Sequence, residues 1–445
     1  MGSAMFGGIA AGGGNRLVYV TRFGRVLTLD TDTGLVVNSF SLLPYGDELK
    51  NFSACAVGAD GSVFVADPRR KLVRRFAQGG RQIARYGQRP IPGVRSQDAQ
   101  GVLDGPCALA LMDEEIFVCC AGDDLIHGVQ RFGLDGESRP SLQNSGDPLA
   151  PWKRPRGITH VDGEIWIGES FAIRIHRSTG DYLRALEIDE RLGRPVRLEQ
   201  DGYGGVLLIL EPSEPGAEDP GIARVSSQGE FDEEWVVKPG EAAGSVRNGI
   251  DLAFLPDGRF AVADVPVAGL AEVRVQLFSS DGRLQRVLVE GEEGLRRQER
   301  DYAEEAWARP AGTADELYEQ AALHHNAGSD HFGQAGALYE QALRAAPGHA
   351  MAHLGFARLL EEGLADPERA ETEYRAAIAA GEPEGELLAR VAECRRMRDD
   401  LDGAIEILKA AVEDPSAPED YDHYVELLAD YFLAWAGQDP GDVQY

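Results

Sequence analysis

One sequence pattern recurs six times in the first 290 residues, and this recurrence limits the folds open to the chain. Each copy has a short apolar run, a hairpin, a second apolar run and a turn that contains glycine. The central apolar runs are residues 18–20, 63–65, 116–118, 165–167, 207–209 and 260–262. The glycine turns follow in the same order, at Gly34, Gly80, Gly136, Gly180, Gly229 and Gly282. Two signals that recur together predict six copies of one structural unit.

Each copy contains about four strand-like runs. In the last copy these runs are residues 250–254, 259–263, 273–278 and 284–289. Alternating β-branched and aromatic residues, separated by turn residues, indicate an antiparallel meander. A single four-stranded sheet leaves both faces uncovered, whereas six sheets packed radially cover one another. The pattern therefore predicts a six-bladed β-propeller.

Some copies carry a more specific motif. Residues 60–67 read Asp-Gly-Ser-Val-Phe-Val-Ala-Asp, and residues 256–264 read Pro-Asp-Gly-Arg-Phe-Ala-Val-Ala-Asp. Two other copies begin with Gly105-Pro-Cys-Ala-Leu and Arg154-Pro-Arg-Gly-Ile. On these motifs, residues 6–290 resemble the NHL-repeat family. The resemblance implies a propeller that serves as an interaction module or, more rarely, as an enzyme.

An acidic residue follows the central run in four of the six copies. These residues are Asp67, Glu169, Glu211 and Asp264. We expect their carboxylates to accept hydrogen bonds from backbone amides of the adjacent hairpin. The alternative is a ring of metal ligands.

The pattern changes after Gly291. Residues 291–312 are highly charged and are predicted to form a helical linker that ends near Pro310. From Thr313 onward Ala, Leu and Glu dominate, which favours helices. One template then recurs at intervals of 35 and 34 residues, as Ala335-Tyr339-Ala342, Ala370-Tyr374-Ala377 and Ala404-Leu408-Ala411. Small residues at this spacing share one helix face and allow another helix to approach closely.

This template resembles the tetratricopeptide (TPR) repeat, which has two antiparallel helices in about 34 residues. Residues 313–437 are therefore expected to form a TPR solenoid of about three repeats plus a capping helix over 420–435. Residues 438–445 would be a tail. The first two repeats depart from the template, with a few extra residues around 328–332 and 363–367.

Charge is distributed unevenly between the two regions. The formal net charge is −30, and residues 311–445 hold 28 Asp and Glu against nine Lys and Arg. This leaves a net charge of only −11 on the first 310 residues. A groove in the helical region would prefer a basic or neutral partner, although the acidic residues could equally form a solvated outer face. The first helix of each repeat is expected to line the groove, with Glu319, His353, Arg390 and Glu393.

Basic residues gather in loops that the expected strand order places on one face of the propeller. They would ring one mouth of the central channel: Arg69, Arg70, Lys71, Lys153, Arg154, Arg156, Arg194, Arg197 and Arg247. Such a ring suits an anionic peptide or phosphate. Nucleic acid is disfavoured, because few exposed aromatic residues lie nearby to stack on bases. The alternative is that these arginines pair with acidic neighbours such as Glu199, Asp201 and Asp251.

Six-bladed propellers also include lactonases and lyases that hold Ca²⁺ or Zn²⁺ in the channel. The candidate ligands are Asn51, Asn248, Asp251, His160 and His176. Asn248 and Asp251 are only two of the three or four ligands such a site needs. No nucleophile elbow, P-loop, HExxH or CxxC motif is present. The sequence therefore predicts no catalytic residue, no metal and no cofactor.

These observations predict a non-catalytic adaptor, scaffold or regulatory subunit that binds proteins or peptides as part of a larger complex. The alternative is a metal-dependent propeller hydrolase or lyase with an appended docking domain. A cytoplasmic location is expected, because the N-terminus lacks a basic start with an apolar run and the five cysteines do not suggest a disulfide framework. No membrane segment is expected, since no apolar stretch approaches the ~20 residues that span a bilayer.

Overall fold

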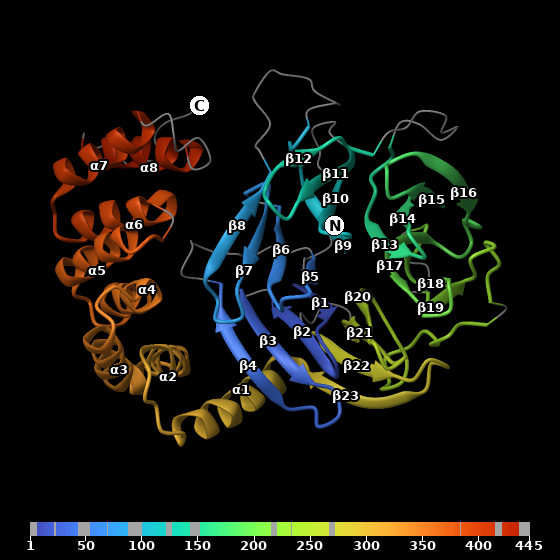
Figure 1. Cartoon of the computed structure of the whole chain (residues 1–445), viewed down its shortest axis with the longest axis horizontal. Helices are drawn as coiled ribbons and strands as arrows, with labels where there is room; N and C mark the ends of the chain where they lie inside the picture. The colour runs from blue at the N-terminus through green and yellow to red at the C-terminus, as the bar shows by residue number, and fades with distance from the viewer. Residues whose placement is uncertain are drawn as a thin grey trace. The chain divides into compact units, whose positions relative to one another are not determined.

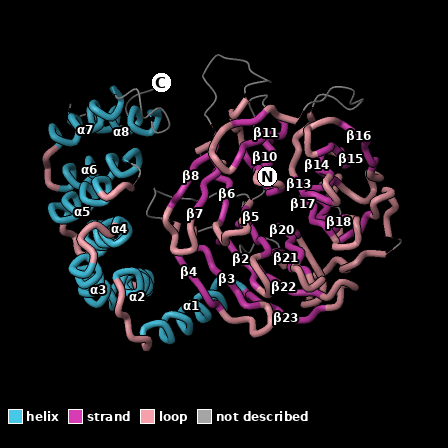
Figure 2. The backbone as a smooth tube through the Cα atoms, viewed as in Figure 1, coloured by secondary structure: helices cyan, strands magenta, loops and turns pink. Residues whose placement is uncertain are grey.

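The computed structural model describes residues 7–21, 24–42, 54–68, 70–87, 100–121, 127–142, 152–214, 220–232, 234–266, 272–382, 384–413 and 421–435. The chain divides into two compact units, residues 1–41 with 48–299 and residues 42–47 with 300–445. The first unit consists mainly of strands and the second of helices (Figure 2).

Six antiparallel sheets make up the first unit, and each is built from strands that are consecutive in sequence. Figure 1 shows these sheets arranged radially. The first three blades are β1 (Gly7–Ala11), β2 (Arg16–Thr21), β3 (Arg25–Asp30) and β4 (Val36–Ser41); β5 (Cys55–Val57), β6 (Val63–Asp67), β7 (Leu72–Phe76) and β8 (Gln82–Tyr86); and β9 (Pro106–Met112), β10 (Glu115–Ala121), β11 (His127–Gly133) and β12 (Ser138–Arg139).

The other three blades continue the same order along the chain. They are β13 (Gly157–Val161), β14 (Glu164–Glu169), β15 (Ala172–Arg177) and β16 (Tyr182–Glu187); β17 (Arg194–Gln200), β18 (Val206–Glu211) and β19 (Ile222–Val225); and β20 (Gly249–Phe254), β21 (Phe260–Asp264), β22 (Arg274–Phe278) and β23 (Leu284–Glu290). The innermost strand of each blade contacts the innermost strands of both neighbouring blades, and β1 meets β20 to complete the ring. The first unit is therefore a six-bladed β-propeller, as the sixfold pattern predicts.

The six central runs lie in the second strand of each blade. Their residues are at most 4% exposed, because each second strand is covered by a neighbouring blade on both faces. Phe64, Phe117 and Trp166 are fully buried there and fill the space between blades. The large side chains at these positions thus act as spacers between radially packed sheets.

The recurring glycines lie in the turns between the third and fourth strand positions. All six have a positive φ, between 78° and 104°, a backbone conformation that favours glycine. At Gly282 the constraint is also steric, since a Cβ atom there would lie 1.8 Å from the carbonyl oxygen of Val236.

The fifth blade departs from the expected four strands. Among its described residues the sheet contains three strands, and two isolated antiparallel bridges, Ile222 with Val237 and Val225 with Phe231, occupy its outer edge. Its other outer contacts involve an irregular stretch in which Pro239 forms a parallel bridge with Val246. A proline cannot donate a ladder hydrogen bond, which is consistent with a broken outer strand.

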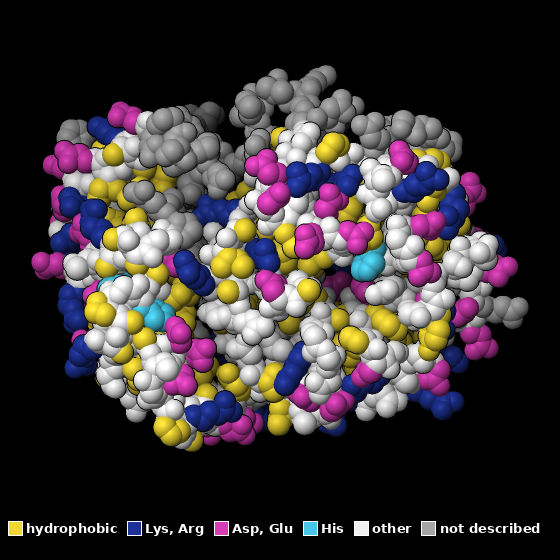
Figure 3. All heavy atoms as spheres, in the orientation of Figure 1, with side chains coloured by type: hydrophobic (Ala, Val, Ile, Leu, Met, Phe, Trp, Pro, Cys, Tyr) yellow, Lys and Arg dark blue, Asp and Glu magenta, His cyan; other side chains and the backbone are white. Residues whose placement is uncertain are grey.

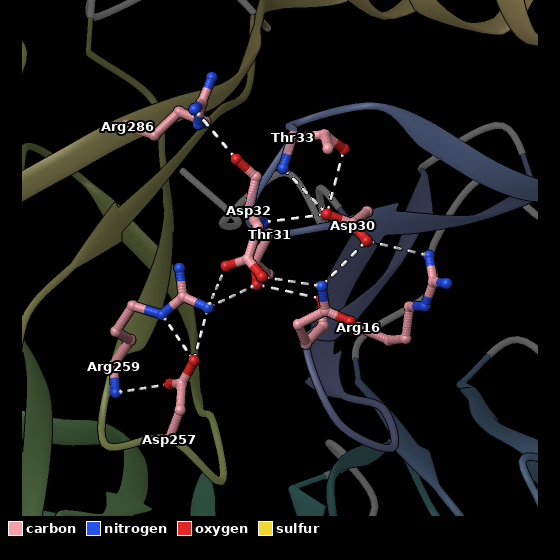
Figure 4. Close-up of polar contacts among 9 residues, drawn as sticks. Arg16, Asp30, Thr31, Asp32, Thr33, Asp257, Arg259 and Arg286 are labelled. Carbon is pink, nitrogen blue, oxygen red and sulfur yellow. Dashed lines mark hydrogen bonds and ion pairs between the residues drawn. The ribbon is translucent and has the colours of Figure 1, made fainter.

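The ring closes by side-chain contacts between the first and last blades. In Figure 4, Arg259 of the last blade donates to Asp32 Oδ1 at 2.7 Å and to Thr31 Oγ1 at 3.0 Å. Asp257 holds the same guanidinium through Nε at 2.7 Å, and Arg286 donates to the carbonyl oxygen of Asp32 at 3.0 Å. Every described sheet uses only consecutive strands, so these contacts and the packing of β1 against β20 join the two blades without an exchanged strand.

The C-terminal region contains eight α-helices among the residues that the structure describes. They are α1 (Gly291–Trp307), α2 (Ala314–Ala327), α3 (Phe332–Ala345), α4 (Ala350–Arg358), α5 (Pro367–Ala379), α6 (Glu384–Met397), α7 (Leu401–Glu413) and α8 (Tyr421–Trp435). A short 3₁₀ turn, η2 (Ser329–His331), precedes α3, and a π-helical turn, η3 (Leu359–Gly363), follows α4. From α2 onward, each helix packs against the next one along the chain.

The recurring template residues form the contacts between these helices. The six template alanines are at most 4% exposed, and Tyr339, Tyr374 and Leu408 are at most 1% exposed. Gly355 on α4 lies so close to Tyr339 that a Cβ atom at this glycine would be 2.7 Å from the phenol oxygen. Small residues therefore permit the close helix packing that their spacing predicts. In the described part of the chain, no helix is long and apolar enough to cross a membrane.

Candidate functional site at the mouth of the propeller

The predicted basic face corresponds to one end of the inner ring of strands. The innermost strands begin at this end and the second strands end there. Antiparallel pairing therefore brings the loops that enter the innermost strands beside the hairpins that follow the second strands. We call this end the mouth. Acidic and basic side chains are interspersed over the propeller face shown in Figure 3.

Arg197 links three blades at the mouth. It lies on β17 beside a bulge between Pro195 and Arg197. Its Nη1 donates to the carbonyl oxygens of Val196 at 2.8 Å and Arg156 at 3.0 Å, and its Nε lies 3.4 Å from Asp251 Oδ1. One side chain thus joins the fourth, fifth and sixth blades.

Asp251 on β20 extends this connection to the first blade. Its Oδ2 accepts a hydrogen bond from the Ile9 amide at 2.9 Å, and its Oδ1 accepts one from the Leu252 amide at 3.0 Å. Gly8 allows this approach, because a Cβ atom there would lie 2.9 Å from Asp251 Oδ2. The carboxylate is therefore buried but fully engaged by donors.

Burial shifts the acid–base properties of the groups around this pair. It raises the pKa of Asp251 to about 6, against the opposing effect of Arg197. Burial and the charge of Asp251 raise the pKa of Glu199 to about 8. The thiol of Cys55 has a pKa well above its ordinary value, and burial raises that of Cys107 to about 11. Glu199 is consequently a neutral acid at pH 7 beside an ionised Asp251–Arg197 pair.

Several predicted mouth cations have acidic partners. Lys71 Nζ lies 2.8 Å from Asp104 Oδ1, Arg156 pairs with Glu211, and Arg247 pairs with Glu241. The acid beside Arg197 is Asp251, which is one of the acidic partners that the sequence predicts as the alternative to a free basic ring. Asp201, by contrast, pairs with Arg224 on β19.

The remaining predicted cations are placed differently. Arg194 donates to the carbonyl oxygen of Ser213 at 3.0 Å and lies over the Phe171 ring, 5.5 Å from its centroid. Lys153 and Arg154 are exposed, whereas Arg70 is half-buried and its amide donates to Asp67. Arg69 lies outside the described residues.

The acids that follow the central runs bind side chains as well as backbone amides. Asp67 accepts from the Arg70 amide, Glu169 from the Lys153 amide and Asp264 from the Arg247 amide. The same three carboxylates also pair with arginines of their own third strands, Arg74, Arg174 and Arg274.

These three arginines were missed by the sequence reasoning. Arg74 and Arg174 are fully buried and Arg274 is 6% exposed. Arg174 donates through Nε to Glu169 at 2.6 Å and also lies over the Trp152 ring, 4.4 Å from its centroid. The available signal was an arginine within the third strand of the second, fourth and sixth blades, the same three blades whose second strand ends in one of these acids. These ion pairs occupy the carboxylates of Asp67, Glu169 and Asp264, so the three acids have a structural role.

The metal candidates do not converge on a common point. His160 and His176 lie opposite Ile165 on the two strands that flank it, about 10 Å apart across the sheet. His176 is buried and stacks on Trp152. The side-chain amide of Asn248 donates to the carbonyl oxygen of Val265. Asn51 lies outside the described residues. Among the residues described, no group of three or more His, Cys, Asp or Glu could hold a metal ion.

The predicted groove residues lie on the first helices of the hairpins. His353 Nδ1 is 2.6 Å from Glu373 Oε2 of α5, and Arg390 Nη1 is 3.3 Å from Glu361 Oε1. Glu393 accepts from the Tyr431 hydroxyl at 2.6 Å, which links α6 to α8. Glu319 is exposed on α2.

No family model matches the chain, and no curated protein matches it. Many solved structures are similar to it, among them three propeller enzymes at low identity. A streptogramin B lyase has 14% identity and a TM-score of 0.45, covering 66% of this chain and 90% of its own. A catalytically inactive virginiamycin B lyase from Staphylococcus aureus with quinupristin has 14% identity and a TM-score of 0.44, covering 64% and 86%. A gluconolactonase from Xanthomonas campestris has 15% identity and a TM-score of 0.42, covering 63% and 88%. At these scores the likenesses support no statement about function.

Proposed function

We propose that this protein is a non-catalytic adaptor that binds a segment of another protein through its helical region. The observation that carries the proposal is the threefold recurrence of buried Ala, Tyr or Leu, and Ala between consecutively packed helices. In this proposal α2 to α7 are three TPR units and α8 is their cap. The propeller, of NHL type in the same proposal, is a second binding surface.

Charge favours a basic or neutral partner at the helical surface. The first turn of α2 carries Asp315 and Glu316, and Glu319 follows one turn later, all three exposed. Partial desolvation and the neighbouring charges of Asp315 and Glu316 raise the pKa of Glu319. A cation docking beside Glu319 would relieve this repulsion between like charges.

The test is affinity purification with the full-length chain as bait. Glu319→Lys reverses the charge on α2, and Glu340→Lys makes the same reversal on α3, the second helix of that hairpin. The proposal expects a defined protein on the wild-type chain and on Glu340→Lys, with a clear loss on Glu319→Lys. Recovery of no defined protein, or equal recovery on both variants, would contradict it.

A second candidate function is acid–base catalysis at the mouth. The raised pKa values of Glu199 and Asp251 favour it, since acids that titrate near neutral pH are typical of catalytic sites. The ion pair and hydrogen bonds that occupy Asp251 weigh against it. Turnover of lactone or ester substrates by the wild-type chain, abolished in Glu199→Gln, would establish this candidate over the adaptor.

A further inference from the structure

Three aromatic rings gather where α1, α2 and the η2 turn meet. The Trp307 ring stacks on His324 with centroids 4.1 Å apart and an interplanar angle of 3°. His331 lies 4.8 Å from the same indole, and the two imidazole centroids are 5.4 Å apart. These separations place both imidazoles side by side on one face of Trp307, since rings on opposite faces would be about 9 Å apart.

The two imidazoles turn the same nitrogen toward each other. His324 Nδ1 lies 3.3 Å from His331 Nδ1, and the Gln334 side-chain oxygen lies 3.2 Å from His331 Nδ1. A metal ion bound by two imidazoles at 2.0–2.1 Å in tetrahedral geometry separates its nitrogen ligands by about 3.3 Å. The two nitrogens therefore have nearly the spacing of one edge of such a site.

An added turn creates this arrangement. The residues around 328–332 are extra to the helical template, and they form η2 after Gly328, whose φ is 111°. The turn brings His331 back against His324, seven positions earlier in the sequence. Both imidazoles are half-buried, so an ion can reach them from solvent.

The donor type also suits a transition metal. Imidazole is the commonest protein ligand for such ions, through either ring nitrogen.

We propose that His324 and His331, with the Gln334 oxygen beside them, form an open site for one divalent transition metal such as Zn²⁺, Ni²⁺ or Cu²⁺. Two imidazole ligands leave further coordination positions for water. The order of affinities for divalent ions predicts the tightest binding for Cu²⁺. Mg²⁺, which prefers oxygen ligands, should not bind.

His325 provides a matched control on the same helix. Its ring packs edge-on against Phe332 and Tyr339 rather than against His331, and burial lowers its pKa to about 4. A change at His325 removes a neighbouring neutral imidazole without altering the facing pair.

The experiment measures Cu²⁺ coordination by pulsed electron paramagnetic resonance and Zn²⁺ affinity by calorimetry on the full-length chain. We expect one Cu²⁺ with two coupled imidazoles in the wild type, and one imidazole in His324→Gln or His331→Gln. Zn²⁺ affinity should fall at least tenfold in both variants and stay within twofold in His325→Gln. A wild-type spectrum with fewer than two imidazoles would overturn the proposal even where a variant is unstable. Unchanged Zn²⁺ affinity in both facing variants would also overturn it.

Discussion

The guanidinium of Arg197 and the carboxylate of Asp251 meet at the propeller mouth, with Nε 3.4 Å from Oδ1, although 54 positions separate the two residues in sequence. Arg197 binds the fourth and fifth blades through carbonyl oxygens, and Asp251 binds the first blade through the Ile9 amide. The pair therefore connects four of the six blades. The pair is primarily structural, and it neutralises a cation of the predicted basic ring whose side chain is 17% exposed.

Removing the Arg197 guanidinium should destabilise the folded protein. In Arg197→Met, Asp251 stays buried without its partner, and we expect the free energy of unfolding to fall by about 2–4 kcal/mol. Arg194→Met is the control, because this exposed arginine on the same strand contacts Ser213 and Phe171. Urea denaturation should show that the control lowers the free energy of unfolding by less than about 1 kcal/mol. Equal losses in the two variants would show that the pair has no special role.

Glu199 should make stability depend on pH. Its pKa is about 8 in the folded chain and about 4.3 in the unfolded chain, so the folded state holds a proton across this window. The associated stability is fully present below pH 4.3 and is lost as pH rises through 8.

Glu199→Gln cannot lose that proton, so its stability relative to wild type should rise between pH 5 and pH 8.5. We expect a gain of at least about 1 kcal/mol, measured as thermal unfolding at both pH values. Glu187→Gln, an exposed change on β16, should track the wild type throughout. A Glu199→Gln curve parallel to wild type would contradict the raised pKa.

The ring-closing network can be tested with two arginines in identical local motifs. Arg259 and Arg283 each follow Asp-Gly in the last blade and pair with that aspartate. Only Arg259 also reaches Asp32 and Thr31 of the first blade, while Arg283 is 83% exposed. Arg259→Ala should lower the free energy of unfolding by about 1 kcal/mol, and Arg283→Ala should leave it within about 0.5 kcal/mol. Chemical denaturation measures both, and the reverse order would argue against closure by these contacts.

Close helix packing predicts opposite effects for two glycine substitutions. Gly355→Ala should destabilise the helical region by about 1–2 kcal/mol, because the new methyl group would overlap the buried Tyr339 ring. Gly333→Ala on α3 meets no atom within 4 Å and should stabilise by about 0.5–1 kcal/mol through helix propensity. Circular dichroism at 222 nm during thermal unfolding distinguishes the two. If Gly355→Ala stabilised the protein, α3 and α4 would be packed more loosely than the contact between Gly355 and Tyr339 indicates.

The sequence predicts the propeller well because its signals are local. Central apolar runs and positive-φ glycines repeat within each blade, so strand order and turns follow from short segments. The broken outer edge of the fifth blade was not anticipated, because Pro239 stands outside any recurring run.

The candidate site was harder to predict because its contacts are long-range. The basic residues of the mouth are visible in the sequence, but their partners are set by blade packing, as with Lys71 and Asp104. The burial of Arg174 likewise depends on Glu169 and Trp152 from other parts of the blade. The extra turn at His331 is visible in the sequence as an insertion, whereas the packing of His331 against Trp307 is not.

The adaptor account is tested most directly by measuring partner recovery for three full-length chains in one assay: wild type, Glu319→Lys and Glu199→Gln. The account predicts stoichiometric recovery of a protein partner by the wild type and by Glu199→Gln, and at least a tenfold loss for Glu319→Lys. Loss of the partner in Glu199→Gln with full retention in Glu319→Lys would place function at the propeller mouth and contradict the account.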